Sequence, residues 1–282
     1  MLKNSIWLFF FVGIVISLVI LNYGGNKRPT YDVLWTCTSY FDYNNGERWD
    51  AFCTAMDSIV KHHSPETLRR IQKWILLNEY DSHPKRDYAR LVHEKYPWIE
   101  FVQKPPGQGG ISNSINHLLK TYVPHSRLWI HWEDTWVVRA PFLDRAIDTM
   151  NKRTDITQLT FVYKNGRTEW SDVDPVRLNC SADYCLVTPH PDRSWYDRWD
   201  GSVEGMTDEV SAKWDETWPL YQLLPSINRS AFYRGLPEFH TERKHAEWLF
   251  AKEWLRAGGV KAFFKNAPVW RPTEGTHVST HD

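Results

Sequence analysis

The sequence predicts an α/β protein built on a doubly wound, Rossmann-like mixed sheet flanked by helices. Between residues 31 and 104, segments that alternate like strands take turns with segments whose apolar residues recur at helical spacing. The 282-residue chain is 42% hydrophobic, which is enough for one large core. It contains neither an internal repeat nor a low-complexity segment.

The elements of the first half follow from their residue patterns. Apolar and polar side chains alternate in the first segment, as in a half-buried strand, and a polar loop follows it. The second helical pattern stops before Pro97. The expected order is a strand at 31–40, a helix at 49–62, a strand at 71–81, a helix at 85–96 and a strand at 98–104.

The second half opens with the loop "KPPGQGG", which leads into a helix starting near Ser112 or Asn113. Free amides in its first turn could hold a phosphate, but the loop lacks GxGxxG and the P-loop lysine, and an Asn/Ser cap is the alternative. Residues 180–235 are rich in Trp, Pro and Asp, and we expect them to form long ordered loops over a site. The other expected elements are a strand at 128–138, a helix with Pro141 at its first position and Leu143, Ile147 and Met150 on one face, a hairpin at Asn165-Gly166, a helix capped by Thr241 and stopped by Gly258-Gly259, and a strand at 260–270.

The N-terminus predicts a membrane segment. Ile6–Leu21 is uncharged and reaches 18 residues with Ser5 and Asn22, the lower end for a bilayer-spanning helix. We expect residues 1–25 to be an uncleaved signal anchor, 26–30 a linker and 31–282 a single domain. A cleaved signal peptide is the alternative, and nearly balanced flanking charges leave the orientation open.

Cysteines and glycosylation sequons bear on the compartment. Cys180–Cys185 and Cys37–Cys53 are possible disulfides in an oxidising lumen, and free buried thiols are the alternative. Sequons at Asn179 and Asn228 agree with a lumenal domain. We therefore expect a single-pass membrane protein whose domain is lumenal, as in the Golgi or ER, or otherwise tethered to a membrane.

Charge and aromatic content narrow the partners. The 34 basic and 34 acidic side chains give a net charge of zero, and without long basic runs there is no electrostatic footprint for nucleic acid. Many of the 16 tryptophans lie among polar residues. Aromatic faces beside polar groups suit a sugar, and core packing is the alternative for each ring.

The most unusual stretch is "LWIHWEDTWVV" at 128–138, in which Glu133 and Asp134 follow an apolar run. Burying an ionised carboxylate without a partner is very costly, so this pair calls for a function. Ligands of doubly wound sheets bind beyond the carboxyl ends of the strands. This rule selects the acidic pair, Thr36, Ser39 and Tyr40, the acids of "NEYD" and the "PPGQGG" loop.

The order of features resembles the nucleotide-sugar-dependent glycosyltransferases of the GT-A fold, particularly the family 2-like group. The resemblance rests on "QGGISNSIN" opening a helix, "HWEDTW" ending an apolar strand, and "AEWLFAKEWLRAGG" before a strand and a histidine. It covers residues 30–280 in layout, and similar membrane-anchored versions are encoded by large DNA viruses. It implies the transfer of a hexose, with inversion, from a UDP- or GDP-sugar to a glycan or glycoconjugate.

The resemblance also implies where the donor binds. Glu133 and Asp134 match the acidic motif that holds Mn²⁺ or Mg²⁺ on the donor's diphosphate, with His277, or alternatively His281, as a further ligand. This chain departs from the pattern at Thr135, where many relatives have a second Asp, and some GT-A enzymes use basic side chains instead of a metal. The implied donor-binding residues are Thr36, Ser39, Glu79, Asp81, Gln108, Gly110, Asn113 and Asn116.

Candidate catalytic residues are Asp134 and Glu247. Glu247 matches the base that deprotonates the acceptor hydroxyl, ahead of Glu242 and His240, and an ordinary exposed helix carboxylate is the alternative. By the same layout, the acceptor-facing wall consists of Trp195, Trp199, Trp214 and Trp218.

Two other functions remain open. A non-catalytic carbohydrate-binding protein could keep this fold, and Thr135 is the feature that favours it. A glycoside hydrolase is weaker, because it needs acids from separate segments that face each other across the scissile bond. Glu133 and Asp134 are neighbours that point in alternate directions on an extended chain.

Overall fold

The computed structural model describes residues 30–41, 47–79, 86–105, 108–162, 178–189, 221–241 and 246–271. The chain divides into two compact units, Met1–Thr30 and Tyr31–Asp282, and every described helix and strand lies in the second. Among these described residues, no helix is both long and apolar enough to cross a membrane. The expected signal anchor at 1–25 lies outside them.

A nine-stranded mixed sheet, in the order β3-β2-β1-β4-β9-β6-β10-β8-β7, organises the described residues. A two-stranded sheet pairs β5 with β11. The strands are β1 (Tyr31–Ser39), β2 (Lys73–Asn78), β3 (Ile99–Gln103), β4 (Ser126–Glu133), β5 (Val137–Val138), β6 (Gln158–Thr160), β7 (Leu178–Cys180), β8 (Tyr184–Val187), β9 (Ser226–Arg229), β10 (Lys261–Phe264) and β11 (Val269–Trp270).

The strand order contains a topological switch point. Strand β1 pairs in parallel with β2 on one side and with β4 on the other, and β2 pairs in parallel with β3. The chain therefore builds outward from β1 to β3 and then returns to the far side of β1. Strand β9 then pairs antiparallel with β4 and β6. The predicted doubly wound mixed sheet is confirmed, and its ligand crevice is expected between the carboxyl ends of β1 and β4.

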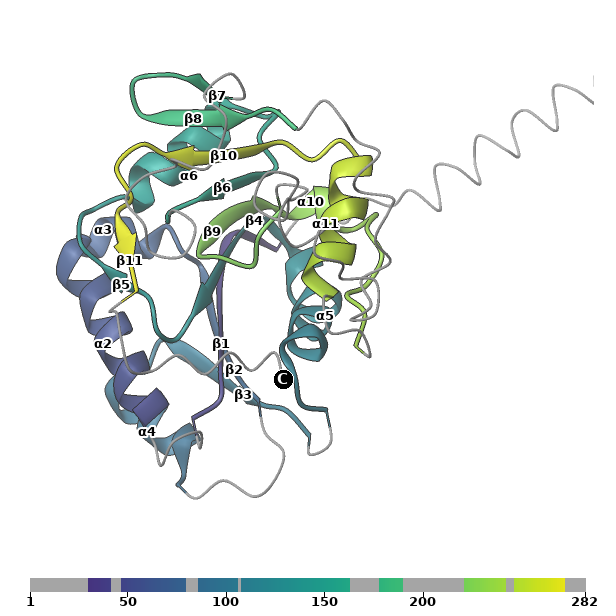
Figure 1. Ribbon diagram of the computed structural model, residues 1–282. Helices are drawn as coiled ribbons and strands as arrows, with labels where there is room; N and C mark the ends of the chain where they lie inside the picture. Colours follow the sequence, from purple (N-terminus) through teal and green to yellow (C-terminus); the bar gives the residue numbers. More distant parts are fainter. Residues whose placement is uncertain are drawn as a thin grey trace, which may run out of the picture. The chain divides into compact units, whose positions relative to one another are not determined.

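Helices cover both faces of the sheet (Figure 1). Helices α2, α3, α4 and α6 lie on one face, and α5, α10 and α11 lie on the other. Their bounds are α2 (Glu47–His62), α3 (Pro65–Arg69), α4 (Tyr88–Lys95), α5 (Ile111–Thr121), α6 (Leu143–Lys152), α10 (Ser230–Tyr233) and α11 (Ala246–Arg256), with a 3₁₀ turn, η2 (Val123–His125), before β4.

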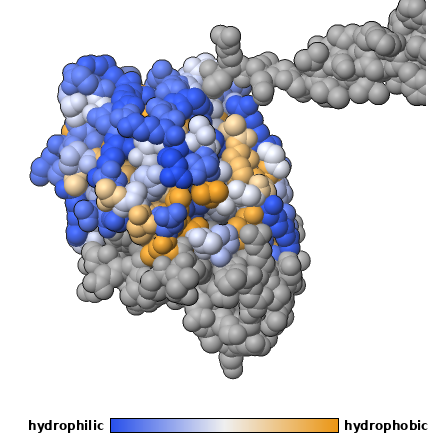
Figure 2. Space-filling view, turned by 90° about the horizontal axis from the view of Figure 1, so that it is seen from above, coloured by the Kyte–Doolittle hydropathy of each residue, from blue (hydrophilic) through white to orange (hydrophobic). Residues whose placement is uncertain are grey.

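Because both faces are covered, the central strands are apolar on both. Successive residues of β4 join opposite clusters: Ile130 packs with α2 and α6, and Trp129 with α5 and α11. On the outside, hydrophilic residues form most of the described surface in the view of Figure 2. Trp35, Trp129, Trp132, Trp248 and Trp254 are fully buried, so core packing explains these five rings.

Several element boundaries differ from the expectation. The last strand is two strands, β10 and β11, and the 128–138 strand is interrupted by a turn after Glu133. Pro141 precedes α6, which begins at Leu143, although Leu143, Ile147 and Met150 do share its buried face. Helix α3 was not expected. The hairpin turn at Asn165-Gly166 and residues 242–245, between the expected cap Thr241 and α11, lie outside the described ranges.

The predicted stop of α11 is confirmed. Gly258 has φ 87°, a left-handed conformation that glycine adopts without strain. The amides of Gly258 and Gly259 donate to the carbonyls of Leu255 and Trp254, both at 3.0 Å. This arrangement turns the chain directly into β10.

The structure tests the expected disulfides and the accessibility of the two sequons. A disulfide joins Cys180 to Cys185 between β7 and β8, as expected. Cys37 and Cys53 are free thiols, so the Cys37–Cys53 pairing is wrong. Asn228 is buried and its amide is bonded within the core, which closes this sequon to glycosylation, whereas Asn179 is exposed.

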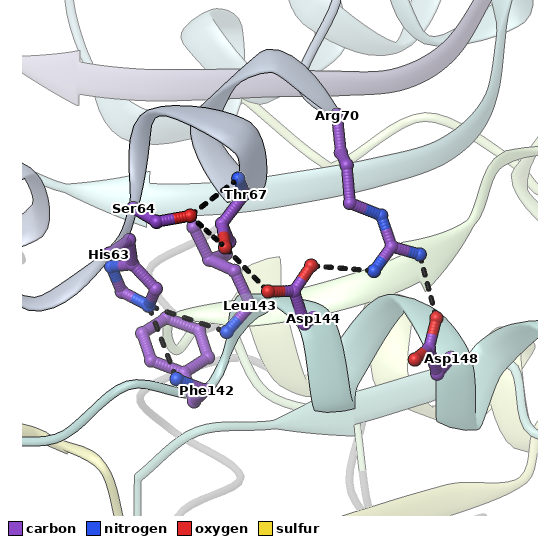
Figure 3. A network of polar contacts seen from close by, with 8 residues as sticks. All are labelled: His63, Ser64, Thr67, Arg70, Phe142, Leu143, Asp144 and Asp148. Atoms are coloured by element: carbon purple, nitrogen blue, oxygen red, sulfur yellow. Dashed lines mark hydrogen bonds and ion pairs between the residues drawn. The ribbon is translucent and has the colours of Figure 1, made fainter.

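A polar network holds α3 against the start of α6 (Figure 3). His63 donates from Nδ1 to the Ile59 carbonyl at 2.9 Å, and its Nε2 accepts from the amides of Phe142 and Leu143 at 3.2 and 3.3 Å. The neutral imidazole therefore caps α6, whose N-cap residue, Phe142, has no side chain able to do so. We call this set the α3–α6 network: His63, Ser64, Thr67, Arg70, Phe142, Leu143, Asp144 and Asp148.

Candidate active site

The carboxyl ends of β1, β2 and β4 lie side by side at the switch point. Residue pairing places Ser39 beside Asn78, and Thr38 beside Glu133. Glu79 continues the ladder, because its amide donates to the Ser39 carbonyl at 2.6 Å. The polar residues predicted at this edge from separate strands are thus brought together.

Asp134 is the most buried acid of this edge, with 1% of its surface exposed. Its Oδ2 accepts from the Ser39 hydroxyl at 2.6 Å, and its Oδ1 pairs with Arg48 of α2 at 2.8 Å. Burial raises the pKa of Asp134 to about 6, against the opposing attraction of Arg48 and the bond from Ser39. The loss of solvent therefore outweighs a direct ion pair.

Glu133 is the last residue of β4, and Asp134 follows it in the turn after the strand. Its Oε2 accepts from the Trp136 indole at 2.9 Å, and the Arg271 guanidinium lies 5.7 Å from the centre of the Trp136 ring. Burial raises the pKa of Glu133, while Trp136 and Arg271 oppose that rise. An aromatic ring and an arginine thus lie next to this carboxylate.

The carboxylate of Glu79, which follows β2, lies against the start of α5. The helix begins after Gly110, which has φ 90° and provides no capping side chain. Burial raises the pKa of Glu79, and the Ser114 hydroxyl, the Lys104 ammonium and the Gly110 amide oppose that rise. Lys104 itself is buried and donates to Ser114 at 2.9 Å. The anion at this helix N-terminus is therefore a protein carboxylate.

Glu247 lies in the first turn of α11. Its Oε1 accepts from the Leu223 amide at 2.6 Å. Burial raises the pKa of Glu247 to about 7; the Leu223 amide and Lys261 oppose this rise, and the charge of Glu133 adds to it. Glu247 is thus a fixed carboxylate that changes protonation near neutral pH, as a general base requires.

These acids form one electrically connected group, which we call the carboxylate cluster: Glu79, Glu133, Asp134 and Glu247. The charge of Asp134 acts on Glu79, that of Glu79 on Glu133, and that of Glu133 on both Asp134 and Glu247. Buried carboxylates whose pKa values are raised by burial and by one another are characteristic of functional sites.

Other predicted donor residues are occupied elsewhere. Thr36 is fully buried in β1, where its hydroxyl accepts from the Trp129 indole at 2.7 Å. The side-chain amide of Asn116 donates to the Phe239 carbonyl at 2.8 Å and accepts from the Phe239 amide at 2.7 Å. Asn113 donates to the Gly109 carbonyl, and Gln108 is exposed. Thr36 and Asn116 therefore stabilise the scaffold with the groups that were expected to hold the donor.

Part of the prediction concerns residues that the structure does not describe. His240 is described and exposed, whereas the following lie outside the described ranges: Asp81, Trp195, Trp199, Trp214, Trp218, Glu242, His277 and His281. Conversely, sequence reasoning missed Arg48, Lys104, Trp136 and Arg271. Only Trp136 carried a local signal, because it belongs to the same stretch as the acidic pair.

The expected metal ligands do not form a metal centre among the described residues. Both oxygens of Asp134 are bonded to protein groups, and Thr135 supplies no carboxylate. Within the described ranges, no group of three His, Cys, Asp or Glu residues is placed to hold a metal ion. A cation bound to Asp134 would have to compete with Arg48.

Comparisons with known proteins address the fold. No family model and no curated protein matches the sequence. The chain superimposes on S. aureus TarS 1-349 with a TM-score of 0.53 and 14% identity, covering 86% of this chain and 60% of that one. The chain also superimposes on GalNAc-T7, solved with UDP, GalNAc and Mn²⁺, with a TM-score of 0.53 and 10% identity, covering 87% of this chain and 44% of that one.

This chain has the GT-A fold. TarS 1-349 has also been solved in complex with UDP, and the chain matches that structure with a TM-score of 0.52 and 12% identity, over 86% of its own length and 61% of that protein's. The chain thus spans less than two thirds of the length of each of these proteins.

Proposed function

We propose that the protein is a glycosyltransferase that moves a hexose from a UDP- or GDP-sugar to a hydroxyl of a glycan or glycoconjugate, with inversion. The observation that carries the proposal is Glu247. It is a fixed carboxylate with a pKa of about 7 that is coupled to Glu133, and Glu133 ends the strand beside the switch point of a GT-A sheet. TarS and GalNAc-T7, which share the fold, have been solved with UDP.

In the proposed reaction Glu247 takes the proton from the acceptor hydroxyl. The acceptor oxygen forms a bond to the anomeric carbon, the bond between that carbon and the diphosphate oxygen breaks, and the nucleoside diphosphate leaves from the opposite face. Leu223 holds Oε1 of Glu247, so we assign the proton to Oε2. A base whose pKa is close to the operating pH is efficient for this transfer.

In the proposed reaction, basic side chains neutralise the negative charge of the leaving diphosphate. Arg48, Lys104 and Arg271 surround the carboxylate cluster, and a guanidinium binds phosphate well in bidentate fashion. GalNAc-T7 has been solved with Mn²⁺, which is the support for Mn²⁺ or Mg²⁺ as the alternative in this chain. In this chain Arg48 pairs with the expected ligand Asp134, so a basic side chain already lies where the cation was expected.

The anchored, lumenal placement is part of the proposal. Residues 1–25 would hold the domain to a membrane, as in the anchored versions encoded by large DNA viruses, and Trp195, Trp199, Trp214 and Trp218 are the proposed acceptor-binding residues. The Cys180–Cys185 disulfide and the exposed Asn179 sequon support an oxidising lumen. Protease protection of the domain in sealed microsomes tests this placement, and digestion without detergent would refute it.

A panel of UDP- and GDP-sugars offered to the full chain in detergent tests the activity. We expect donor hydrolysis or transfer, and Glu247→Gln should reduce it by about 100-fold or more, because the base is lost without a change of shape. Glu253→Gln, on the exposed side of the same helix, is the matched control. If the wild-type chain neither binds nor turns over any donor, the proposal fails.

The second candidate function is sugar-nucleotide or glycan binding without catalysis. Thr135 favours it, because its hydroxyl is buried without a hydrogen-bond partner where an acid was expected. Donor binding by the wild-type chain with no turnover, unchanged in Glu247→Gln, would establish this function instead.

A further inference from the structure

Two polar side chains near Glu247 are buried in the sheet. Gln158 of β6 and Lys261 of β10 are paired neighbours in parallel strands, and each has 1% of its surface exposed. Long polar side chains are rarely buried this deeply unless they are bonded. Their shared partner explains their position.

The shared partner is Gln222. The Gln158 amide donates to the Gln222 carbonyl at 2.9 Å and accepts from the Gln222 amide at 3.3 Å, which fixes the backbone of this residue in both directions. The Lys261 ammonium donates to the Gln222 side-chain oxygen at 2.5 Å. Two strands of the sheet thus clamp a single residue of the segment that precedes β9.

The next peptide group reaches the proposed base. The amide that donates to Glu247 Oε1 belongs to Leu223, the residue directly after the clamped Gln222. A continuous series of hydrogen bonds therefore runs from the buried sheet through one short piece of backbone to the carboxylate. Helix α11 contributes only the acceptor at the end of this series, Glu247 itself.

We propose that Gln158 and Lys261 are positioning residues for Glu247: by clamping Gln222 they hold the Leu223 amide, and through it the carboxylate, in one place. This inference rests on the proposed function for its meaning in catalysis. Both residues are buried, so we assign them no contact with the acceptor or the donor. They act on the base through the backbone, and Lys261 acts also through its charge.

Within the described ranges, the charged and titratable groups that act on Glu247 come from three parts of the chain. Glu133 of β4 opposes ionisation of Glu247 and Lys261 of β10 favours it. Tyr221, in the segment before β9, also interacts with Glu247, and burial raises the pKa of this phenol far above the neutral range. Among these groups Lys261 is the cation, so its removal should make Glu247 harder to ionise.

The test is an NMR titration of the Glu247 carboxyl carbon in the full chain, assigned with Glu247→Gln. Lys261→Met should raise the midpoint by about one pH unit, because it removes a nearby positive charge and releases Gln222. Gln158→Leu should broaden or shift the Leu223 amide signal. Thr160→Val, equally buried and next but one to Gln158 on β6, leaves the clamp intact and should change neither signal.

The wild-type chain gives a second measurement if a variant does not fold. The Leu223 amide proton should titrate with the same midpoint as the Glu247 carboxyl, since the two are bonded. An amide that ignores this titration, or a Lys261→Met midpoint within about 0.2 units of the wild type, would overturn the proposal. A merely structural role for Lys261 would lower the melting temperature without moving the midpoint.

The titration separates this inference from the proposed function. If no sugar nucleotide is turned over, the glycosyltransferase proposal fails while the NMR midpoints still test the clamp. If turnover is observed, the acidic limb of kcat/KM should move upward in Lys261→Met with the NMR midpoint. An unmoved limb would show that the clamp does not serve the base.

Discussion

The α3–α6 network and the carboxylate cluster contain the same chemical unit in two settings. In the network, Asp144 accepts from the Thr67 hydroxyl and pairs with Arg70. In the cluster, Asp134 accepts from the Ser39 hydroxyl and pairs with Arg48. Yet the pKa of Asp144 is lowered and that of Asp134 is raised to about 6.

Burial accounts for the difference. The Asp144 side chain is 53% exposed, so the bonds from Thr67 and Arg70 outweigh the modest cost of desolvation. The Asp134 side chain is 2% exposed, and the same two bonds do not repay the loss of water. Burying the charge of Asp134 is unfavourable, so we expect this acid to have a function at the switch point. Asp144, by contrast, only connects α6 to α3.

Replacing Asp134 and Asp144 by asparagine should give the largest difference between the two regions. Asp134→Asn is expected to reduce donor turnover by about 100-fold or more, the range for loss of a positioned charge in an active site. Its melting temperature at pH 7.5 should stay nearly unchanged, because the lost ion pair is offset by relief from burying a charge. Asp144→Asn should leave turnover unchanged. A large loss of stability in Asp134→Asn would mark that acid as structural.

Removal of each arginine tests the same comparison through stability. Arg48→Met should cost about 2 kcal/mol of unfolding free energy at pH 7.5, because it leaves a buried charge alone. Arg70→Met should cost about 0.5 kcal/mol, as for exposed pairs. The raised pKa of Asp134 predicts that the Arg48→Met deficit shrinks at pH 5, where the carboxyl is protonated and needs no partner. Denaturant unfolding at both pH values measures this, and an equal deficit at pH 5 contradicts it.

The cap on α6 gives the network its own pH dependence. Burial lowers the pKa of His63, so the folded protein prefers the neutral ring that accepts from Phe142 and Leu143. A lowered folded pKa means that this stabilisation is present above the ordinary pKa of 6.5 and is lost as pH falls toward the folded value. Asp144 nearby favours the protonated ring, and His62 opposes it.

The measurement is the slope of unfolding free energy between pH 7.5 and 5. His63→Gln keeps an acceptor that does not titrate and should flatten the slope by about 1 kcal/mol over this range. His125→Gln, on the 3₁₀ turn before β4, is the control. An unchanged slope in His63→Gln would show that the His63 cap does not contribute to the pH dependence of stability.

The sequence predicted the sheet better than the site. Hydrophobic periodicity and the glycines and prolines that end elements were enough to predict β1, α4 and the Gly258-Gly259 stop, because each depends on nearby residues. Glu133 and Asp134 were found for the same reason, since adjacent acids after an apolar run are a local anomaly. Arg48 and Gln222 were not found, because a bond to Asp134 or Lys261 depends on how distant strands are ordered, and no local pattern encodes it.

Metal removal is expected to have the smallest effect. If Arg48 holds the place of a cation at Asp134, donor turnover in EDTA should stay within about twofold of that in Mn²⁺. Arg48→Met frees Oδ1 of Asp134, so the residual turnover of this variant should respond to Mn²⁺ more than that of the wild type. A wild-type chain that loses activity in EDTA and regains it with Mn²⁺ would show instead that the ion pair opens when the donor binds, with the further ligands coming from the C-terminal residues that include His277.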